Sequence, residues 1–168
     1  SNDIWVGKDS ASDKIDYFGY TKKTILTLHN LAMIKRGWLP IHGAFVNIYL
    51  KDGTKKGIML MGDSGAGKSE SIEALKAAAG DMIREVEVVF DDMGTIHLED
   101  GVPYGQGTEI GAFIRLDDLD PGTPYRDMDR SIFMAPENPN ARMIQPAAPY
   151  RVVVHNHKID LFAYANNY

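Results

Sequence analysis

The sequence predicts a strand-rich α/β fold with mixed sheets, built as one domain. Short runs of β-branched and aromatic residues recur through the second half of the chain, separated by turns rich in Gly, Pro and Asp, which is typical of strands. Few segments have helical spacing or composition, whereas a doubly wound parallel sheet needs a helix after almost every strand. The length of 168 residues matches one domain of ordinary size.

Composition and charge narrow the classes of function. The chain is 44% hydrophobic and 24% charged, as in globular proteins. Because it has no cysteine, a disulfide scaffold, thiol catalysis and Cys-ligated metal sites are excluded, and we expect a reducing, cytoplasmic location. The net charge of −5 provides no overall positive field, and no apolar stretch approaches the roughly 20 residues that span a bilayer. We therefore expect neither nucleic acid nor a membrane as a partner, and the oligomeric state cannot be inferred.

The first half of the chain contains both predicted helices. Residues 22–36 place apolar side chains at three- and four-residue spacing and are followed by Gly37, which predicts a helix that ends there. Residues 44–50 and 57–61 predict two strands, and Asp52-Gly53 between them indicates a hairpin. Residues 69–79, rich in Ala, Glu, Lys and Leu, predict the second helix.

The second half predicts only strands, at 86–90, 95–98, 110–116, 131–134, 141–145, 151–155 and 159–165. Between the last two lie His155, Asn156 and His157, which could form a metal-binding pair. Because we place them on a hairpin turn, exposed histidines are the simpler interpretation.

A phosphate-binding loop is the strongest motif. GDSGAGKS at 62–69 satisfies the pattern G-x-x-x-x-G-K-[ST] and lies between a predicted strand and a predicted helix. Its glycines allow backbone N–H groups to turn toward a phosphate, and the helix N-terminus adds partial positive charge. Lys68 would reach the β- and γ-phosphates and the Ser69 hydroxyl would bind Mg²⁺. The predicted nucleotide-binding residues are Gly62, Asp63, Ser64, Gly65, Ala66, Gly67, Lys68 and Ser69.

An acidic partner for this loop follows the strand predicted at 86–90. Asp91 and Asp92 come directly after that strand, and Asp91 lies 23 positions beyond Lys68. One carboxylate can hold Mg²⁺, and the other can hold a second metal or act as a general base. An ordinary Asp-Asp turn is the alternative.

Four further blocks, in order, resemble the nucleotide-binding core of ATP-dependent phosphoenolpyruvate carboxykinase. Residues 17–23 (YFGYTKK) resemble its Tyr-x-Gly-Glu-x-Lys-Lys segment, and residues 39–42 (LPIH) resemble its Met-His segment. The 19 positions between Lys23 and His42 match the family spacing. The resemblance implies that Lys23, His42 and Asp92 hold Mn²⁺, and nitrogen and oxygen donors with open positions suit such a site.

The other two blocks each contain an arginine that the resemblance implies contacts a phosphate. Residues 109–115 (EIGAFIR) place Arg115 where the family has a phosphate-contacting lysine, and residues 140–142 (NAR) with Pro146 place Arg142 where its arginine steadies the transferred phosphoryl group. Arg115 could equally be a surface strand residue. The resemblance therefore gives the catalytic candidates as Lys22, Lys23, Asp91, Arg115 and Arg142.

The resemblance covers about residues 17–146 and is not uniform. Gly43-Ala44-Phe45 stands where the carboxykinases have Ser-Ala-Asn, and Met93-Gly94 where they have Glu-His. The loop GDSGAGKSE is closer to HPr kinase/phosphorylase, where the first Asp of the pair is the base and the residue matching Glu70 joins the metal shell.

Three functions remain open from the sequence. The first is a carboxykinase-like core that binds ATP, Mg²⁺ and Mn²⁺ and converts oxaloacetate and ATP to phosphoenolpyruvate, CO₂ and ADP. The second is a kinase acting on a protein or small molecule, with Asp91 as base. The third is an ATP-binding module without turnover. Because whole carboxykinases are much longer, we expect residues 1–168 to be one nucleotide-binding domain of a longer protein.

Overall fold

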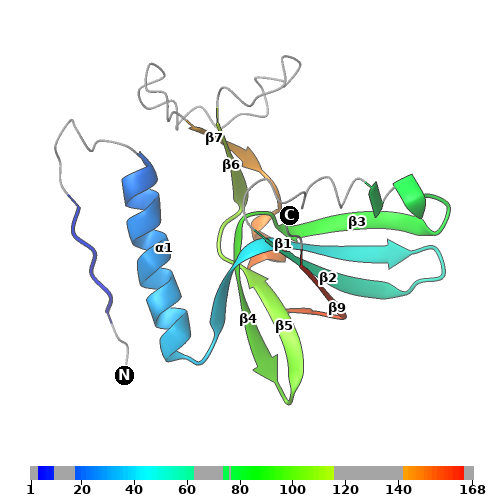
Figure 1. The fold of residues 1–168 in the computed structure, drawn as a ribbon, viewed down its shortest axis with the longest axis horizontal. Coiled ribbons are helices and arrows are strands. Elements are labelled where there is room, and N and C mark those ends of the chain that lie inside the picture. The colour runs from blue at the N-terminus through cyan, green and yellow to red at the C-terminus, as the bar shows by residue number, and fades with distance from the viewer. Residues whose placement is uncertain (1–3, 10–17, 63–73, 76, 116–141, 165–168) are drawn as a thin grey trace.

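The computed structural model describes residues 4–9, 18–62, 74–75, 77–115 and 142–164 (Figure 1). The elements with described bounds follow one another in the order α1 (Phe18–Lys35), β1 (Leu39–Leu50), β2 (Lys55–Met61), β3 (Ile83–Phe90), β4 (Met93–Glu99), β5 (Val102–Gly107), β6 (Gly111–Arg115), β7 (Arg142–Pro146), α3 (Tyr150–Val153), β8 (His157–Lys158) and β9 (Leu161–Tyr164).

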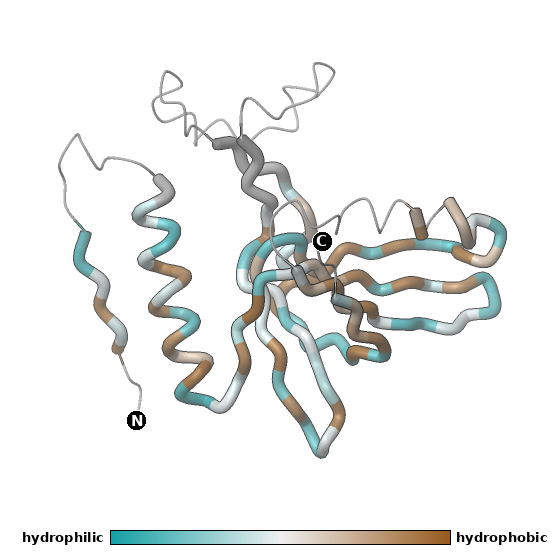
Figure 2. The backbone as a smooth tube through the Cα atoms, viewed as in Figure 1, coloured by the Kyte–Doolittle hydropathy of each residue, from teal (hydrophilic) through white to brown (hydrophobic). Residues whose placement is uncertain are grey.

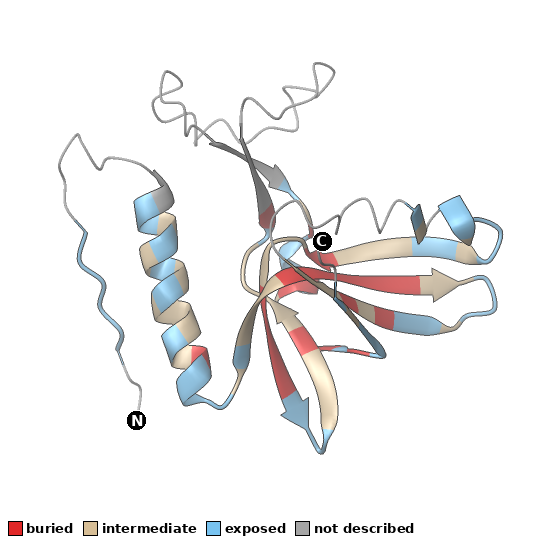
Figure 3. Ribbon diagram, viewed as in Figure 1, coloured by how far each residue is buried: buried red, intermediate tan, exposed pale blue. Residues whose placement is uncertain are grey.

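Helix α1 confirms the helix predicted at 22–36 and begins four residues earlier. It ends where the sequence predicted, because Gly37 adopts a φ of +80° that other residues reach only with strain. The N–H groups of Gly37 and Trp38 donate to the carbonyls of Ile34 and Met33, a Schellman cap that satisfies the last turn. Among residues 20–35 of α1, whose burial the structure describes, Met33 is the only buried one, whereas Ile25 and Leu31 are exposed. Figure 3 accordingly shows α1 as mostly exposed or intermediate.

The long strand β1 organises the sheet. Seven strands form one sheet in the order β8-β5-β4-β1-β2-β9, with β3 also paired to β1, and β6 and β7 form a separate ribbon. Residues 39–42 of β1 pair with β4, and residues 45–50 pair with β3, so β1 exchanges one neighbour for another near Gly43. Its other edge pairs with β2 through residues 43–49, which confirms the predicted hairpin.

The directions of β2 and β3 determine at which end of the sheet each strand finishes. Because β2 and β3 are both antiparallel to β1, they run parallel to each other on its two sides, and their C-terminal ends lie at the same end of the sheet. Strand β9 is parallel to β2, whereas the other pairs are antiparallel. The sheet is therefore mixed, as the sequence predicted, and the coarse strand-rich α/β class is confirmed.

The core forms on both faces of β1, because successive side chains of a strand alternate between faces. Phe45 packs on one face with Met59, Phe90 and Val152. On the other face Ala44, Val46 and Ile48 pack with apolar residues of β2 and β3 and with Leu75. In Figure 2 hydrophobic residues recur along β1, β2 and β3, and in Figure 3 much of β1 is buried.

A buried polar network corrects two predictions about residues 151–157. The strand predicted at 151–155 is wrong, because α3 occupies 150–153 and buries Val152 and Val153. His157 is not exposed but belongs to β8, with only 9% of its surface accessible. Its Nε2 lies 2.7 Å from the Val152 carbonyl and its Nδ1 3.0 Å from Asn47 Nδ2. These contacts suit a neutral imidazole, and burial lowers the pKa of His157.

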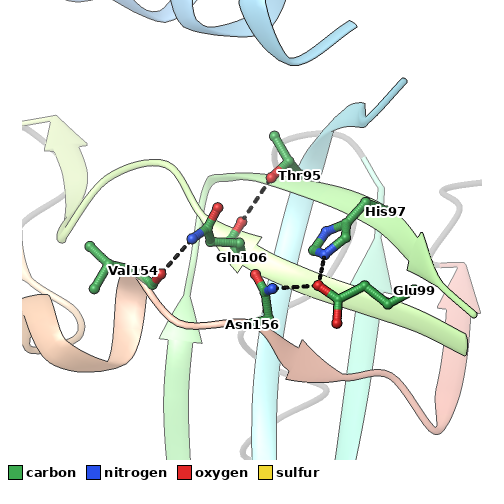
Figure 4. Close-up of polar contacts among 6 residues, drawn as sticks. All are labelled: Thr95, His97, Glu99, Gln106, Val154 and Asn156. Carbon is green, nitrogen blue, oxygen red and sulfur yellow. Dashed lines mark hydrogen bonds and ion pairs between the residues drawn. The ribbon is translucent and has the colours of Figure 1, made fainter. Parts of the chain in front are cut away.

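A second network ties α3 and β8 to the β4–β5 hairpin (Figure 4). The Gln106 side chain donates from Nε2 to the carbonyl of Val154, and Glu99 Oε1 accepts from Asn156 Nδ2 at 2.8 Å and lies 2.9 Å from His97 Nε2. These contacts fix strand β5, whose end leads directly to Thr108 and Glu109.

The remaining strand predictions have mixed outcomes. The predicted strands at 86–90, 95–98, 110–116, 141–145 and 159–165 correspond to β3, β4, β6, β7 and β9, whereas β5 was not predicted. The predicted strand at 131–134 and most of the predicted helix at 69–79 lie outside the described residues, although 74–75 and 77–78 are helical. Across the described part of the chain, no helix combines the length and apolar character needed to cross a membrane.

Candidate functional site

The start of the predicted phosphate loop and the Asp91-Asp92 pair lie on opposite sides of Gly43 in β1. Gly43 is the register partner of Met61, the last residue of β2, and Gly62 follows at once. On the other side the Gly43 N–H donates to the carbonyl of Asp92 at 3.0 Å. The backbone therefore brings two segments, 30 residues apart in sequence, to one end of the sheet.

Gly43 permits this close approach because it has no side chain. A Cβ atom at this position would lie 2.6 Å from the carbonyl oxygen of Leu60, a distance that real Cβ contacts essentially never show. Glycine at the place where the carboxykinases have serine thus has a local structural reason. Residues 63–69 of the loop, including Lys68 and Ser69, lie outside the described residues.

Asp92 is the centre of a polar cluster. Its Oδ1 lies 2.9 Å from His42 Nε2, and its Oδ2 lies 3.4 Å from Lys22 Nζ. The three side chains come from the bend after β3, from β1 and from α1. About a third of the Asp92 side chain is accessible, so the carboxylate can be reached by a ligand.

Glu109 completes this cluster, which we call the Asp92 cluster and define as Lys22, His42, Asp92 and Glu109. Glu109 follows β5, and its Oε2 lies 3.3 Å from Lys22 Nζ. Its Oε1 is buried without a hydrogen-bond partner among the described residues. Burial raises the pKa of Glu109 to about 7; the Lys22 ammonium opposes this shift and the Asp92 carboxylate adds to it.

The structure distinguishes the two neighbouring lysines. Lys22 is mostly buried and contacts both carboxylates, whereas Lys23 is exposed. Successive residues of a helix point about 100° apart, so both cannot face the same carboxylate. The lysine near Asp92 is therefore Lys22, and not Lys23, which the resemblance assigned as a metal ligand.

His42 and Asp92 can serve as two ligands of a divalent cation. Adjacent ligands of an octahedral ion with bonds of about 2.1 Å lie about 3 Å apart, close to the 2.9 Å between His42 Nε2 and Asp92 Oδ1. Within the described ranges no group of three or more His, Cys, Asp or Glu residues could hold a metal by itself. A histidine nitrogen with a carboxylate oxygen suits an ion such as Mn²⁺, which would keep water and substrate phosphate in its remaining positions.

The other predicted site residues are placed by their backbones. Asp91 is partly buried in the bend beside Asp92. Arg115 and Arg142 are register partners in the β6–β7 ribbon, so their backbones lie side by side. Arg115 ends β6, about 13 Å along an extended strand from Gly111, and Arg142 lies opposite it at the start of β7. Both arginines are therefore at the end of the ribbon farthest from Glu109. Figure 1 shows this ribbon projecting from the main sheet, so the described backbone does not bring the arginines to Asp92.

Sequence reasoning did not identify Glu109 as a site residue. The only signal was its position at the head of the segment that resembles the family's Glu-Gly-Gly block. Its burial and its contact with Lys22 depend on β5, which the sequence did not predict. Glu109 was found only once the strand before it was placed.

Comparison with known proteins adds no assignment. A scan against protein-family models found no match, and a search of curated proteins found none.

Proposed function

We propose that this chain is a phosphoryl-transfer core that binds a nucleoside triphosphate and divalent metal, with a carboxykinase-like P-loop fold. The observation that carries this proposal is the position of Gly62 and Asp92 on either side of Gly43, at the C-terminal ends of two parallel strands. A glycine-rich loop at one strand end and an acidic residue at a nearby end are the elements that hold phosphates and Mg²⁺ in P-loop proteins.

The Asp92 cluster supplies the charges that the reaction needs. Asp92 and His42 would hold a divalent ion, Mn²⁺ or Mg²⁺, which supplies positive charge to the oxygens of the transferred group. Lys22 places an ammonium beside the same carboxylate and can attract the γ-phosphate. Lys68 and Ser69 would hold the phosphates and Mg²⁺ on the loop.

The reaction that we propose is that of a phosphoenolpyruvate carboxykinase. In oxaloacetate the bond to the departing carboxylate breaks and releases CO₂, and its electron pair forms an enolate. The enolate oxygen then attacks the γ-phosphorus of ATP, which gives phosphoenolpyruvate and releases ADP. The support is the contact between His42 and Asp92, since these are two of the three ligands that the resemblance implies. We place the protein in the cytoplasm, where its cysteine-free composition fits.

A kinase acting on a protein or small molecule is the second candidate. The observation that favours it is the exposure of Lys23, because a kinase needs an acidic metal ligand and a base such as Asp91 but no lysine ligand. Such a kinase would transfer the γ-phosphoryl group of ATP to its acceptor without oxaloacetate.

Incubation with γ-labelled ATP and Mn²⁺, with and without oxaloacetate, tests the proposed reaction. We expect labelled phosphoenolpyruvate and release of CO₂ only when oxaloacetate is present. With candidate protein or small-molecule acceptors added in place of oxaloacetate, a labelled acceptor would indicate the kinase instead. Saturable ATP binding with neither product would contradict both and indicate a module that binds ATP without turnover.

A further inference from the structure

Lys22 lies between two carboxylates that differ in their surroundings. Its Nζ is 3.4 Å from Asp92 Oδ2 and 3.3 Å from Glu109 Oε2, so it is shared almost equally between them. About 13% of the Glu109 side chain is accessible, against 32% for Asp92. Asp92 is therefore the outer carboxylate, open to a ligand, and Glu109 is the inner one.

A divalent cation at His42 and Asp92 would compete with Lys22 for the same carboxylate. The ammonium and the metal are both positive and both approach Asp92, so they repel each other. Glu109 offers Lys22 a second carboxylate partner, 3.3 Å from its Nζ. With that partner present, the Lys22 ammonium can shift from Asp92 toward Glu109 when the metal binds and still lie beside a carboxylate.

Resting on the proposed function, we propose that Glu109 is a positioning residue that holds the Lys22 ammonium and thereby sets how readily the His42–Asp92 pair accepts a divalent cation. Glu109 acts through Lys22 and is not itself a ligand, in keeping with the fact that no group of three acidic or histidine ligands occurs among the described residues. Without the Glu109 charge, the Lys22 ammonium is held more strongly by Asp92 and opposes the metal more strongly.

The test is a double-mutant cycle on Mn²⁺ binding, measured by calorimetry on the full chain at a pH above the pKa of Glu109, which is about 7, so that this carboxyl group is charged. Glu109→Gln keeps the shape of the side chain and removes its charge, and we expect it to weaken Mn²⁺ binding about tenfold. In a Lys22→Met background the same change should alter the affinity less than about twofold, because the residue through which Glu109 acts is gone. Glu85→Gln, an exposed glutamate of β3, is the matched control and should leave the affinity unchanged.

A second readout needs no metal. The rate at which an amine reagent labels Lys22 should rise several-fold in Glu109→Gln and should be restored by Glu109→Asp, which returns the charge. An equal loss of Mn²⁺ affinity in the two backgrounds would overturn the proposal, since Glu109 would then act directly by its charge. Unchanged affinity and unchanged labelling in Glu109→Gln would overturn it too. Failure of the unsubstituted chain to bind Mn²⁺ is a different result and would contradict the proposed function.

Discussion

Asp92→Asn is expected to weaken Mn²⁺ binding by more than about 100-fold, beyond the 10- to 100-fold loss typical of removing a residue that only supports a ligand. Asparagine keeps the size of the side chain and removes its negative charge. In the structure that carboxylate contacts His42 through one oxygen and Lys22 through the other. With the charge removed, Lys22 remains as a cation beside the site and opposes the metal.

Calorimetric titration of Mn²⁺ into both proteins measures this change. Asp81→Asn is the matched control, because Asp81 is an exposed aspartate shortly before β3, and this variant should bind Mn²⁺ as the unsubstituted chain does. An Asp92→Asn protein that retains Mn²⁺ affinity within about threefold would contradict the assignment of Asp92 as a ligand.

Gly57→Ala is expected to lower the free energy of unfolding by about 3 kcal/mol or more, at the upper end for overpacked sites. A Cβ atom on Gly57 would lie 2.0 Å from the carbonyl oxygen of Lys158 and 2.9 Å from the ring of Phe45. The strand cannot easily move away, because the Gly57 carbonyl accepts from the N–H of Asp160 at 2.8 Å and its own N–H donates to Asp160 Oδ2 at 2.9 Å.

Chemical denaturation followed by circular dichroism measures the loss. Gly101→Ala is the control, because Gly101 has a φ of +78° but nothing within 4 Å of an added Cβ atom. There we expect only the cost of the left-handed backbone, about 1–2 kcal/mol. A Gly57→Ala protein as stable as the unsubstituted chain would show that β2 and the segment at 158–160 do not pack as described.

Elements with local end signals were predictable from the sequence. Gly37 marks the end of α1, and Asp52-Gly53 marks the β1–β2 turn, where Gly53 adopts a φ of +88°. Such signals act within a few residues, so they do not depend on the rest of the fold. The ends of these elements were therefore placed within a few residues.

The sequence predictions were wrong or incomplete where contacts between residues far apart in the sequence determine the structure. Three successive valines at 152–154 favour a strand, but burial of Val152 and Val153 against the core fixes a short helix instead. Strand β5 reads VPYGQG, which resembles a turn. Its glycines are required by packing, since a Cβ atom on Gly105 would touch Phe45 and one on Gly107 would lie 2.7 Å from Val153. Neither contact can be inferred from residues near β5.

The candidate site was predictable in part. Both Asp92 and His42 were named from the sequence, and the structure places them in contact. The choice between Lys22 and Lys23 was not predictable, because it depends on the rotation of α1 relative to β1. Glu109 was missed because its burial depends on the end of β5.

The central claim, that the chain binds a nucleoside triphosphate on the loop that begins at Gly62, is tested most directly by titration with Mg²⁺–ATP. We expect saturable binding that weakens more than about tenfold in Lys68→Ala, because in P-loop proteins the loop lysine contacts the β- and γ-phosphates. Lys51→Ala, at an exposed lysine of the β1–β2 turn, should bind as the unsubstituted chain does. No binding by the unsubstituted chain, or equal binding by Lys68→Ala, would contradict the claim.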